Sequence, residues 1–327
     1  MQETMALIIR QSRFIRNYSL NFVSAIVLVL LSKFIFRQYP ISGLTLTIFN
    51  CLLSSLVSFI VLRIFHKSST SSQTSAIRIQ SFTRTLIISI LFAGSVLFSN
   101  LSLQHNTLAT YQLIKLQVPL MLMVIEYIQL RSNINSPSLT EERFHRDYSL
   151  PVFVAFIIIA FGTIVNISSD ILFHPFGVLF ACLSVLFNAF YQVLVQEEQA
   201  STTYERLRFL QIQTLISAFV LFPFWPFLDE TFPFTLIVLA HWDAPTLFFL
   251  CGFLAFFVNV SAVSCIKDDT AIGYNMVGQL KTLIIVFLGS AIYREVINSQ
   301  QIVSVLLTAI GSVIYVYITY QKKQQLG

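Results

Sequence analysis

Long apolar runs follow one another along this chain, with polar stretches between them. Each run has close to the ~20 residues that an α-helix needs to cross the hydrocarbon core of a bilayer. Because the apolar residues are consecutive and do not alternate with polar ones, the pattern favours helices over the strands of a membrane barrel. It predicts about ten transmembrane helices, at residues 17–36, 42–65, 83–103, 107–128, 149–168, 174–195, 207–228, 245–266, 271–292 and 300–320.

The composition of the chain supports the same class. Hydrophobic residues make up 56% of it and charged residues only 11%, whereas about 25% of a soluble domain is charged. The mean hydropathy is +0.76. The four cysteines form neither a CxxC pair nor a cluster with histidines, so no disulfide framework and no zinc site is predicted. We therefore expect an all-α integral membrane protein that carries no cofactor.

The basic residues predict how the helices are oriented in the membrane. An even number of spans places both termini on one side. If that side is the cytosol, fifteen Lys and Arg residues lie in cytosolic segments and three lie outside, as the positive-inside rule requires. The cytosolic set is Arg10, Arg13, Arg16, Arg63, Lys67, Arg78, Arg84, Arg131, Arg143, Arg146, Arg206, Arg208, Lys267, Lys322 and Lys323, and the outside set is Lys33, Arg37 and Arg294. No dense basic stripe is present, so the pI of 9.0 does not indicate nucleic-acid binding.

The two halves of the chain show an internal similarity. Tyr111 matches Tyr274 at an offset of 163, and residues 160–163 match residues 309–312 at an offset of 149. Five spans are an odd number, so the second copy of such a repeat would be inverted in the membrane. Inverted repeats place a binding site near the midplane, between the two halves.

This repeat divides the chain into four predicted segments. Residues 1–16 form a cytosolic N-terminal segment, and residues 17–168 form the first five-helix repeat. Residues 169–320 form the second, inverted repeat, and residues 321–327 form a cytosolic tail.

Two lysines, Lys115 and Lys281, lie in the middle of apolar stretches long enough to span a bilayer. An ammonium group at that depth costs about 2.5–3.5 kcal/mol on insertion scales, and it usually faces the interior of a helix bundle or a wet cavity. Thr107, Tyr111 and Lys115 are spaced four apart, and Tyr274 precedes Lys281 by seven, so each set shares a helix face. We predict one central cavity whose two positive charges suit a ligand with about two negative ones, such as a diphosphate diester.

Other polar or small residues accompany the two lysines. Gln112 and Asn275 follow the two tyrosines, and their amides can hydrogen-bond a sugar or link helices. Gly278 leaves room for the close approach of a ligand or a neighbouring helix. Lys33, near the end of the first span, is either a gate residue or an anchor at the membrane surface, and we favour the anchor.

Two other interpretations of the sequence are possible. Each lysine could neutralise an acidic residue inside the bundle, and Glu126, three turns from Lys115, is the candidate within the spans. An intramembrane enzyme is disfavoured, because the five histidines form no HExxH or similar paired motif.

Two stretches carry a resemblance to a known family. Residues 99–115 read SNLSLQHNTLATYQLIK, and Val258-Asn-Val-Ser261 is followed by Tyr274-Asn-Met-Val-Gly-Gln-Leu-Lys281-Thr282. They resemble the nucleotide-sugar transporter and triose-phosphate translocator family, within the drug/metabolite transporter superfamily. Within that family they resemble member E3-like proteins of solute carrier family 35. The resemblance implies ten helices in a five-plus-five inverted repeat, in the Golgi or the endoplasmic reticulum.

The resemblance also implies the activity and the substrates. Family members exchange a nucleotide sugar for a nucleoside monophosphate. Plastid sugar-phosphate translocators tend to have Lys-Arg where this chain has Lys281-Thr282, so Thr282 favours a nucleotide sugar. We expect exchange of a UDP-sugar for UMP, with Lys115 and Lys281 on the phosphates. A sugar-phosphate exchanger of the same fold and a transport-inactive scaffold remain alternatives, and the lipid bilayer and a homodimer are the partners compatible with the chain.

Overall fold

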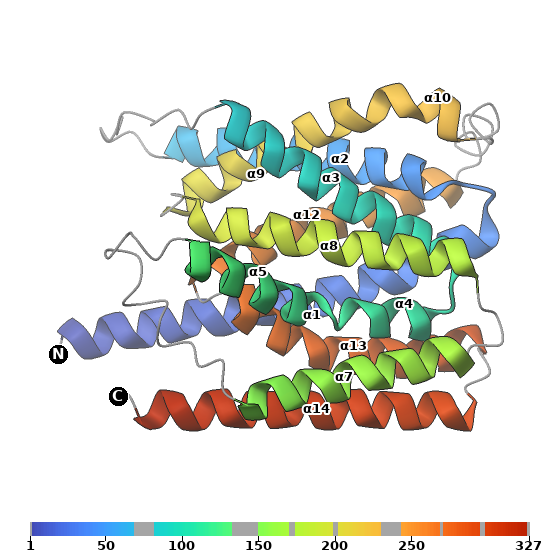
Figure 1. Cartoon of the computed structure of the whole chain (residues 1–327). Helices are drawn as coiled ribbons and strands as arrows, with labels where there is room; N and C mark the ends of the chain where they lie inside the picture. Colours follow the sequence, from blue (N-terminus) through green and yellow to red (C-terminus); the bar gives the residue numbers. More distant parts are fainter. Residues whose placement is uncertain are drawn as a thin grey trace.

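The computed structural model describes residues 2–68, 82–132, 150–169, 174–198, 202–229, 243–268, 271–294 and 298–325. Every regular element within these ranges is a helix, as predicted (Figure 1). In chain order they are α1 (Gln2–Gln38), α2 (Gly43–Ser68), α3 (Phe82–His105), α4 (Leu108–Lys115), α5 (Val118–Ser132), α7 (Leu150–Ser169), α8 (Pro175–Glu197), α9 (Thr203–Leu221), the 3₁₀ helix η2 (Phe222–Phe224), α10 (Trp225–Leu228), α12 (Asp243–Asp268), α13 (Ala271–Tyr293) and α14 (Ser299–Gln325).

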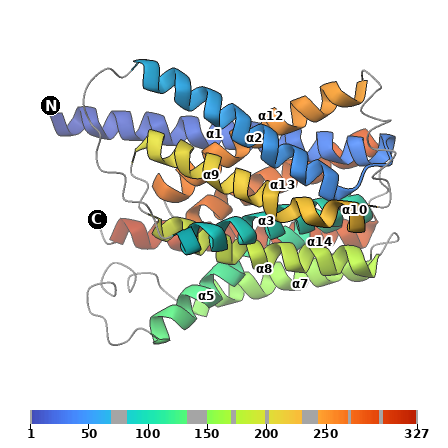
Figure 2. The same ribbon diagram turned by 90° about the horizontal axis from the view of Figure 1, so that it is seen from above.

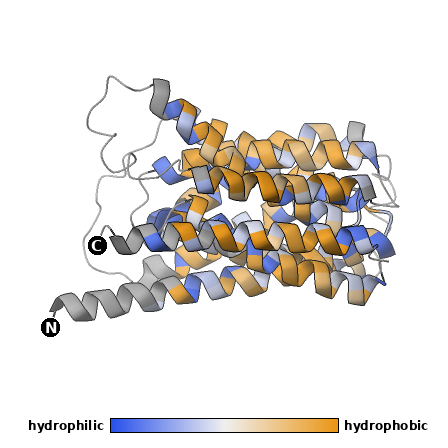
Figure 3. Cartoon of the chain, turned by 60° about the horizontal axis from the view of Figure 1, so that its bottom comes forward, coloured by the Kyte–Doolittle hydropathy of each residue, from blue (hydrophilic) through white to orange (hydrophobic). Residues whose placement is uncertain are grey.

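The helices have the length and polarity of membrane spans. Within the described ranges, nine spans are long and apolar enough to cross a bilayer, and α14 adds a shorter apolar stretch at Ser299–Tyr315. Apolar residues form a band across the middle of the bundle, with hydrophilic residues at its two ends (Figure 3). Large side chains such as Ile157 and Phe219 point outward, with 66% and 67% of their surface exposed. The prediction of an all-α membrane protein with about ten spans is confirmed.

The first helix is longer than the membrane span that it contains. α1 begins at Gln2, within the segment 1–16 that is predicted to precede the first span. The part of α1 that is apolar enough to cross a membrane is Ile15–Gln38, close to the predicted 17–36. Once a helix is nucleated, each added residue gains a backbone hydrogen bond, so a helix readily extends beyond the membrane boundary.

The predicted fourth span is broken into α4 and α5 directly after Lys115. Pro119 has no N–H group, so it cannot bond the carbonyl of Lys115 four residues earlier. The N–H groups of Leu116 and Gln117 bond instead to carbonyls three residues back, at 3.2 and 3.0 Å. Thr163 of α7 accepts a hydrogen bond from Nε2 of Gln117 at 2.6 Å, which braces the break from outside. In transporters, discontinuous helices of this kind border substrate sites.

The helices pack in pairs that lie far apart in the sequence. α7 lies along α14, α3 along α8, α1 along α12, and α2 along α9. Figures 1 and 2 show both termini at the same end of the bundle, which we call the terminal end. In the predicted repeat, each of the first five spans corresponds to one of the last five. By this correspondence α3 matches α12 and α8 matches α1, so the α3–α8 pair is equivalent to the α12–α1 pair. In the other two pairs, α7 matches α14 and α2 matches α9, so each pair is equivalent to itself.

Two glycines allow α7 and α14 to approach closely. A Cβ atom on Gly162 would lie 2.9 Å from the carbonyl oxygen of Ser304, and one on Gly311 would lie 2.8 Å from that of Ala155. Small residues at such crossings let helix backbones touch. The two contacts are reciprocal, because the predicted offset of 149 converts Ala155 to Ser304 and Gly162 to Gly311.

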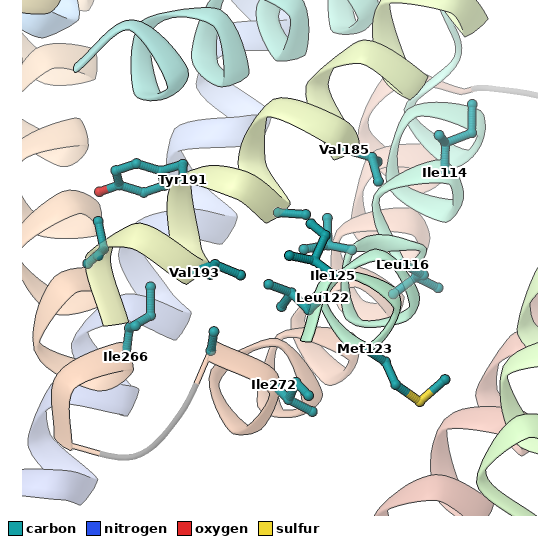
Figure 4. Packing of buried hydrophobic residues seen from close by; sticks show 14 of the residues in the cluster. Ile114, Leu116, Leu122, Met123, Ile125, Val185, Tyr191, Val193, Ile266 and Ile272 are labelled. Atoms are coloured by element: carbon teal, nitrogen blue, oxygen red, sulfur yellow. The ribbon is translucent and has the colours of Figure 1, made fainter. Parts of the chain in front are cut away.

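A large apolar cluster packs α5, α8, α12 and α13 together towards the terminal end. Figure 4 shows Leu122 and Ile125 of α5 beside Val193 of α8, with Ile266 of α12 and Ile272 of α13 next to them. All five side chains are buried. This cluster holds the four helices together beside the polar residues in the middle of the bundle.

Candidate functional site

A cavity of about 260 Å³ lies in the centre of the bundle, between α1, α2, α3, α4, α5, α8, α12 and α13. The structure brings together in its wall every residue that the sequence proposed for the site. These are Lys115, Lys281, Tyr111, Tyr274, Gln112, Asn275, Gly278 and Thr282. Their contact with a ligand stays a prediction. Residues of one binding site must lie around one cavity, and these residues do.

The two lysines reach the cavity from opposite ends of the bundle. Lys115 comes seven residues after Leu108, where α4 begins, and Lys281 comes ten residues after Ala271, where α13 begins. At 1.5 Å per residue, these positions lie about 10 and 15 Å along their helices. A hydrocarbon core is about 30 Å thick, so both lysines lie towards the middle of the membrane.

The charge of the cavity is positive. Among the described residues that line it, Lys115 and Lys281 are the charged ones, and no Asp or Glu is found with them. Neither ammonium group pairs with a carboxylate of the described chain. The interpretation that each lysine neutralises an acidic residue is therefore not supported for Glu126, which does not line the cavity.

Lys115 is held by residues of its own helix and of α3. Its Nζ donates a hydrogen bond to the hydroxyl of Tyr111 at 2.6 Å and lies 4.6 Å from the centre of that ring. The hydroxyl of Tyr111 also pairs with Oγ of Ser99 at 2.7 Å. Because Tyr111 is buried, its ring gives Lys115 a rigid support, and two of the three ammonium protons stay available to a ligand.

Lys281 is held across helices instead. Its Nζ donates to Oδ1 of Asn21 on α1 at 2.9 Å and lies 5.1 Å from the centre of the Tyr274 ring. Asn21 in turn donates from Nδ2 to Oγ of Ser261 on α12 at 3.0 Å. The position of the ammonium group thus depends on how α1, α12 and α13 sit relative to one another.

The remaining predicted residues fill the wall between the lysines. Gln112 is 4% exposed, and Thr282 donates to the carbonyl of Gly278 at 3.2 Å. Asn275 donates from Nδ2 to Oε1 of Gln192 at 2.5 Å. Among the described atoms, a Cβ on Gly278 would meet only the end of the Lys281 side chain, at 3.5 Å or more. Gly278 therefore opens space towards the cavity and does not serve a helix contact.

Two residues beside the predicted set have other contacts. Thr107 caps the N-terminus of α4 and accepts a hydrogen bond from the N–H of Thr110 at 3.3 Å. Lys33 is not a surface anchor, because it is 6% exposed and donates to the carbonyls of Leu103 and Asn106 at 2.8 and 2.5 Å. Its charge stabilises the negative end of the α3 dipole.

Sequence reasoning missed several polar residues that line or support the cavity, and three of them are buried amides. Asn21 supports Lys281, while Asn50 of α2 and Gln279 of α13 are buried in the cavity wall. Each is an amide inside a predicted apolar span, and that was the signal available. Polar residues in a span also link helices, so the signal does not by itself single out a site.

An ionic cluster joins helices at the terminal end of the bundle. Arg84 of α3 lies 3.2 Å from Glu197 of α8 and 3.7 Å from the neighbouring Glu198. Arg206 of α9 lies 2.8 Å from Asp268 of α12. The apolar cluster of Figure 4 also packs helices together towards this end.

The sequence is similar to those of known membrane transporters. The profile of the EamA-like transporter family matches residues 175–317. The chain is similar to UDP-rhamnose/UDP-galactose transporter 3 of Arabidopsis thaliana, with 22% identity over 94% of this chain and 83% of that protein. It is also similar to GDP-mannose transporter GONST5 of Arabidopsis thaliana, with 22% identity over 92% of this chain and 84% of that protein.

A solved crystal structure shows the same fold. It is 13% identical in sequence and superposes with a TM-score of 0.60, over 93% of this chain and 98% of the other. The likeness concerns the arrangement of the helices, and the residues of the cavity must be judged on their own chemistry. That chemistry is a buried, doubly cationic space with aromatic and amide groups in its wall.

Proposed function

Because this chain is a membrane protein of the drug/metabolite transporter superfamily, with an EamA-like domain at residues 175–317, we propose that it carries a nucleotide sugar across the membrane. The full proposal is alternating-access exchange of a UDP-sugar for UMP, in the Golgi or the endoplasmic reticulum, with both termini in the cytosol. The excess of basic residues in the segments at the terminal end supports that orientation.

The observation that carries the proposal is the charge of the cavity. Two ammonium groups line it without a carboxylate among the described lining residues. A diphosphate diester has two negative charges that match them, and charge-assisted hydrogen bonds in a desolvated site are the strong ones. The substrates named for the two plant relatives are nucleoside diphosphate sugars, whose diphosphate diester carries two negative charges. The first of these names supports the choice of a UDP-sugar.

The rest of the wall suits the uncharged parts of such a ligand. The rings of Tyr111, Tyr191 and Tyr274 line the cavity and offer flat surfaces for a base or a sugar. Gln112 and Asn275 supply amides that hydrogen-bond hydroxyl groups or a base. No bond of the substrate needs to be made or broken, so the site requires no catalytic group.

The same charge gives a physical reason for exchange. An empty cavity leaves two ammonium groups without a counter-charge, and rearranging the helices around such charge in the membrane interior is costly. A bound dianion removes that cost. A nucleoside monophosphate carries about −1.5 to −2 charges near neutral pH, so it neutralises the cavity on the return step nearly as well as the nucleotide sugar does.

Alternating access is supported by the reciprocal packing of the two halves. Gly162 and Gly311 occupy matching places in the contact between α7 and α14. An inverted repeat with its site at the midplane lets one half rock against the other, so that the site opens to each side in turn. The proposed halves are residues 17–168 and 169–320, joined between α7 and α8.

The test is exchange in proteoliposomes. Vesicles that contain the purified protein are preloaded with UMP, GMP, CMP or inorganic phosphate, and uptake of labelled UDP-sugars and GDP-mannose is measured. We expect uptake of a UDP-sugar against UMP that is lost in Lys281→Ala. The matched control is Arg208→Ala, which removes a positive charge outside the cavity and should leave uptake unchanged.

The other outcomes decide against the proposal. Uptake that occurs only against inorganic phosphate would identify a sugar-phosphate exchanger. Uptake that survives in Lys281→Ala would show that Lys281 does not hold the substrate. Absence of uptake with every substrate, from protein shown to be folded, would indicate a scaffold that retains the fold.

A further inference from the structure

α13 presents two parallel rows of side chains to the cavity. One row contains Tyr274 and Lys281, which supply an aromatic ring and a charge. The row beside it contains Asn275, Gln279 and Thr282, at helical spacings of four and three. The second row is uncharged, and its middle member is the residue that the proposed function has not used.

Gln279 differs from the other two members of its row. It is 4% exposed, and neither Nε2 nor Oε1 has a hydrogen-bond partner in the described part of the chain. Asn275 and Thr282, by contrast, donate to Gln192 and to the carbonyl of Gly278. A buried amide with both polar atoms unmatched destabilises a fold. Both atoms are buried as the side chain stands, but Gln279 lines the cavity, so a ligand there supplies the missing partners once the amide turns towards it.

The chemistry of a primary amide restricts what that ligand group can be. Nε2 donates and Oε1 accepts, side by side in one plane. Phosphate oxygens accept only, so they would satisfy Nε2 and leave Oε1 unpaired. The phosphates therefore belong with Lys115 and Lys281, and Gln279 suits an uncharged group with an adjacent donor and acceptor.

Nucleobases have such an edge, and its planarity matches the amide. An amide side chain forms two parallel hydrogen bonds with a base edge, as in protein contacts to nucleic-acid bases. A sugar hydroxyl rotates and offers no fixed plane. The rings of Phe92 and Tyr191, 5.3 Å apart, also line the cavity and add the flat apolar surface that a base requires. We propose that Gln279 recognises the hydrogen-bonding edge of the nucleobase. This inference rests on the proposed function and identifies the residue that hydrogen-bonds the base of the nucleotide.

The test compares ligands with and without a base. Dissociation constants of UMP, GMP, CMP and ribose 5-phosphate are measured by calorimetry for the wild-type protein and for Gln279→Met, which keeps length and flexibility and removes both hydrogen-bonding atoms. The nucleoside monophosphate that binds most tightly should bind about 5- to 100-fold more weakly to the variant. Ribose 5-phosphate, which keeps the phosphate and the ribose, should change by less than about twofold.

A second readout does not depend on ligand. Gln279→Met removes two unmatched buried polar atoms, so the melting temperature of the ligand-free protein should rise. A fall would show that the amide is a structural hydrogen-bonding group and would overturn the proposal. Gln279→Asn keeps the amide but withdraws it by one methylene, and its loss of nucleotide affinity should be intermediate.

The control is Ser54→Ala, which also removes a buried polar atom that has no partner among the described residues, but at a place outside the cavity. Its affinities should match the wild type. Equal weakening of UMP and ribose 5-phosphate by Gln279→Met would assign the amide to the sugar or phosphate and overturn the proposal. Wild-type protein that binds none of UMP, GMP and CMP better than ribose 5-phosphate would overturn base recognition alone. Wild-type protein that binds none of the four would overturn the proposed function as well.

Discussion

Lys115 and Lys281 line one cavity, but the two halves of the molecule hold them differently. Lys115 donates to Tyr111 of its own helix, whereas Lys281 donates to Asn21 of another helix, which is itself bonded to a third. When helices move relative to one another, the first contact stays intact and the second changes. The comparison suggests that Lys115 provides a constant charge and that the availability of Lys281 follows the conformation of the carrier.

The largest effect is expected from removing either charge. Lys115→Met and Lys281→Met each delete a charge-assisted contact of about 1.5–3 kcal/mol, so the affinity for UMP should fall about 10- to 100-fold. Calorimetric titration of both single variants and of the double variant measures this. If one single variant binds UMP as well as the wild type does, only one half of the cavity holds phosphate.

A smaller effect on the exchange rate is expected from removing the residue that holds each lysine, Tyr111 for Lys115 and Asn21 for Lys281. Tyr111→Phe removes one hydrogen bond but keeps the ring beneath Lys115, and its exchange rate should fall by about two- to threefold. Asn21→Leu removes the one contact that joins Lys281 to α1, and its exchange rate should fall by about three- to tenfold. Initial rates of UMP exchange in proteoliposomes test the order. A larger loss in Tyr111→Phe than in Asn21→Leu would reverse the comparison.

The smallest effect on ligand affinity is expected where the halves are alike. Gly162→Ala and Gly311→Ala each insert a methyl group against a backbone carbonyl, and overpacking of this kind costs about 1–3 kcal/mol. Thermal unfolding should show a similar loss of stability for both variants, while the affinity for UMP stays within about twofold. A large loss for one glycine and none for the other would show that the two contacts are not equivalent.

Much of this architecture was predictable because membrane solvation restricts the chain strongly. A continuous apolar run of membrane length has few stable conformations other than a helix. Lysine at mid-membrane has few stable environments other than a polar interior, and for that reason Lys115 and Lys281 indicated the cavity correctly.

The unpredicted features depend on contacts between helices. Pro119 was visible in the sequence, but the position of the break also depends on Thr163 of α7. Lys33 looks like a surface anchor until the carbonyls of the α3 C-terminus are placed beside it. Gln279 could not be distinguished from a helix-linking amide, because its distinguishing property is the lack of a partner in the folded, described chain.

The ionic cluster at the terminal end makes the carrier sensitive to electrolyte on one side. Its pairs join α3 to α8 and α9 to α12, and Arg84 keeps 41% of its side chain exposed. Dissolved salt screens such exposed pairs but acts little on Lys33, which is buried against carbonyls near the opposite end. Raising the ionic strength at the terminal end therefore weakens the contacts between helices there and leaves the contacts of Lys33 unchanged. The two ends of the bundle thus respond differently to the same change of solution.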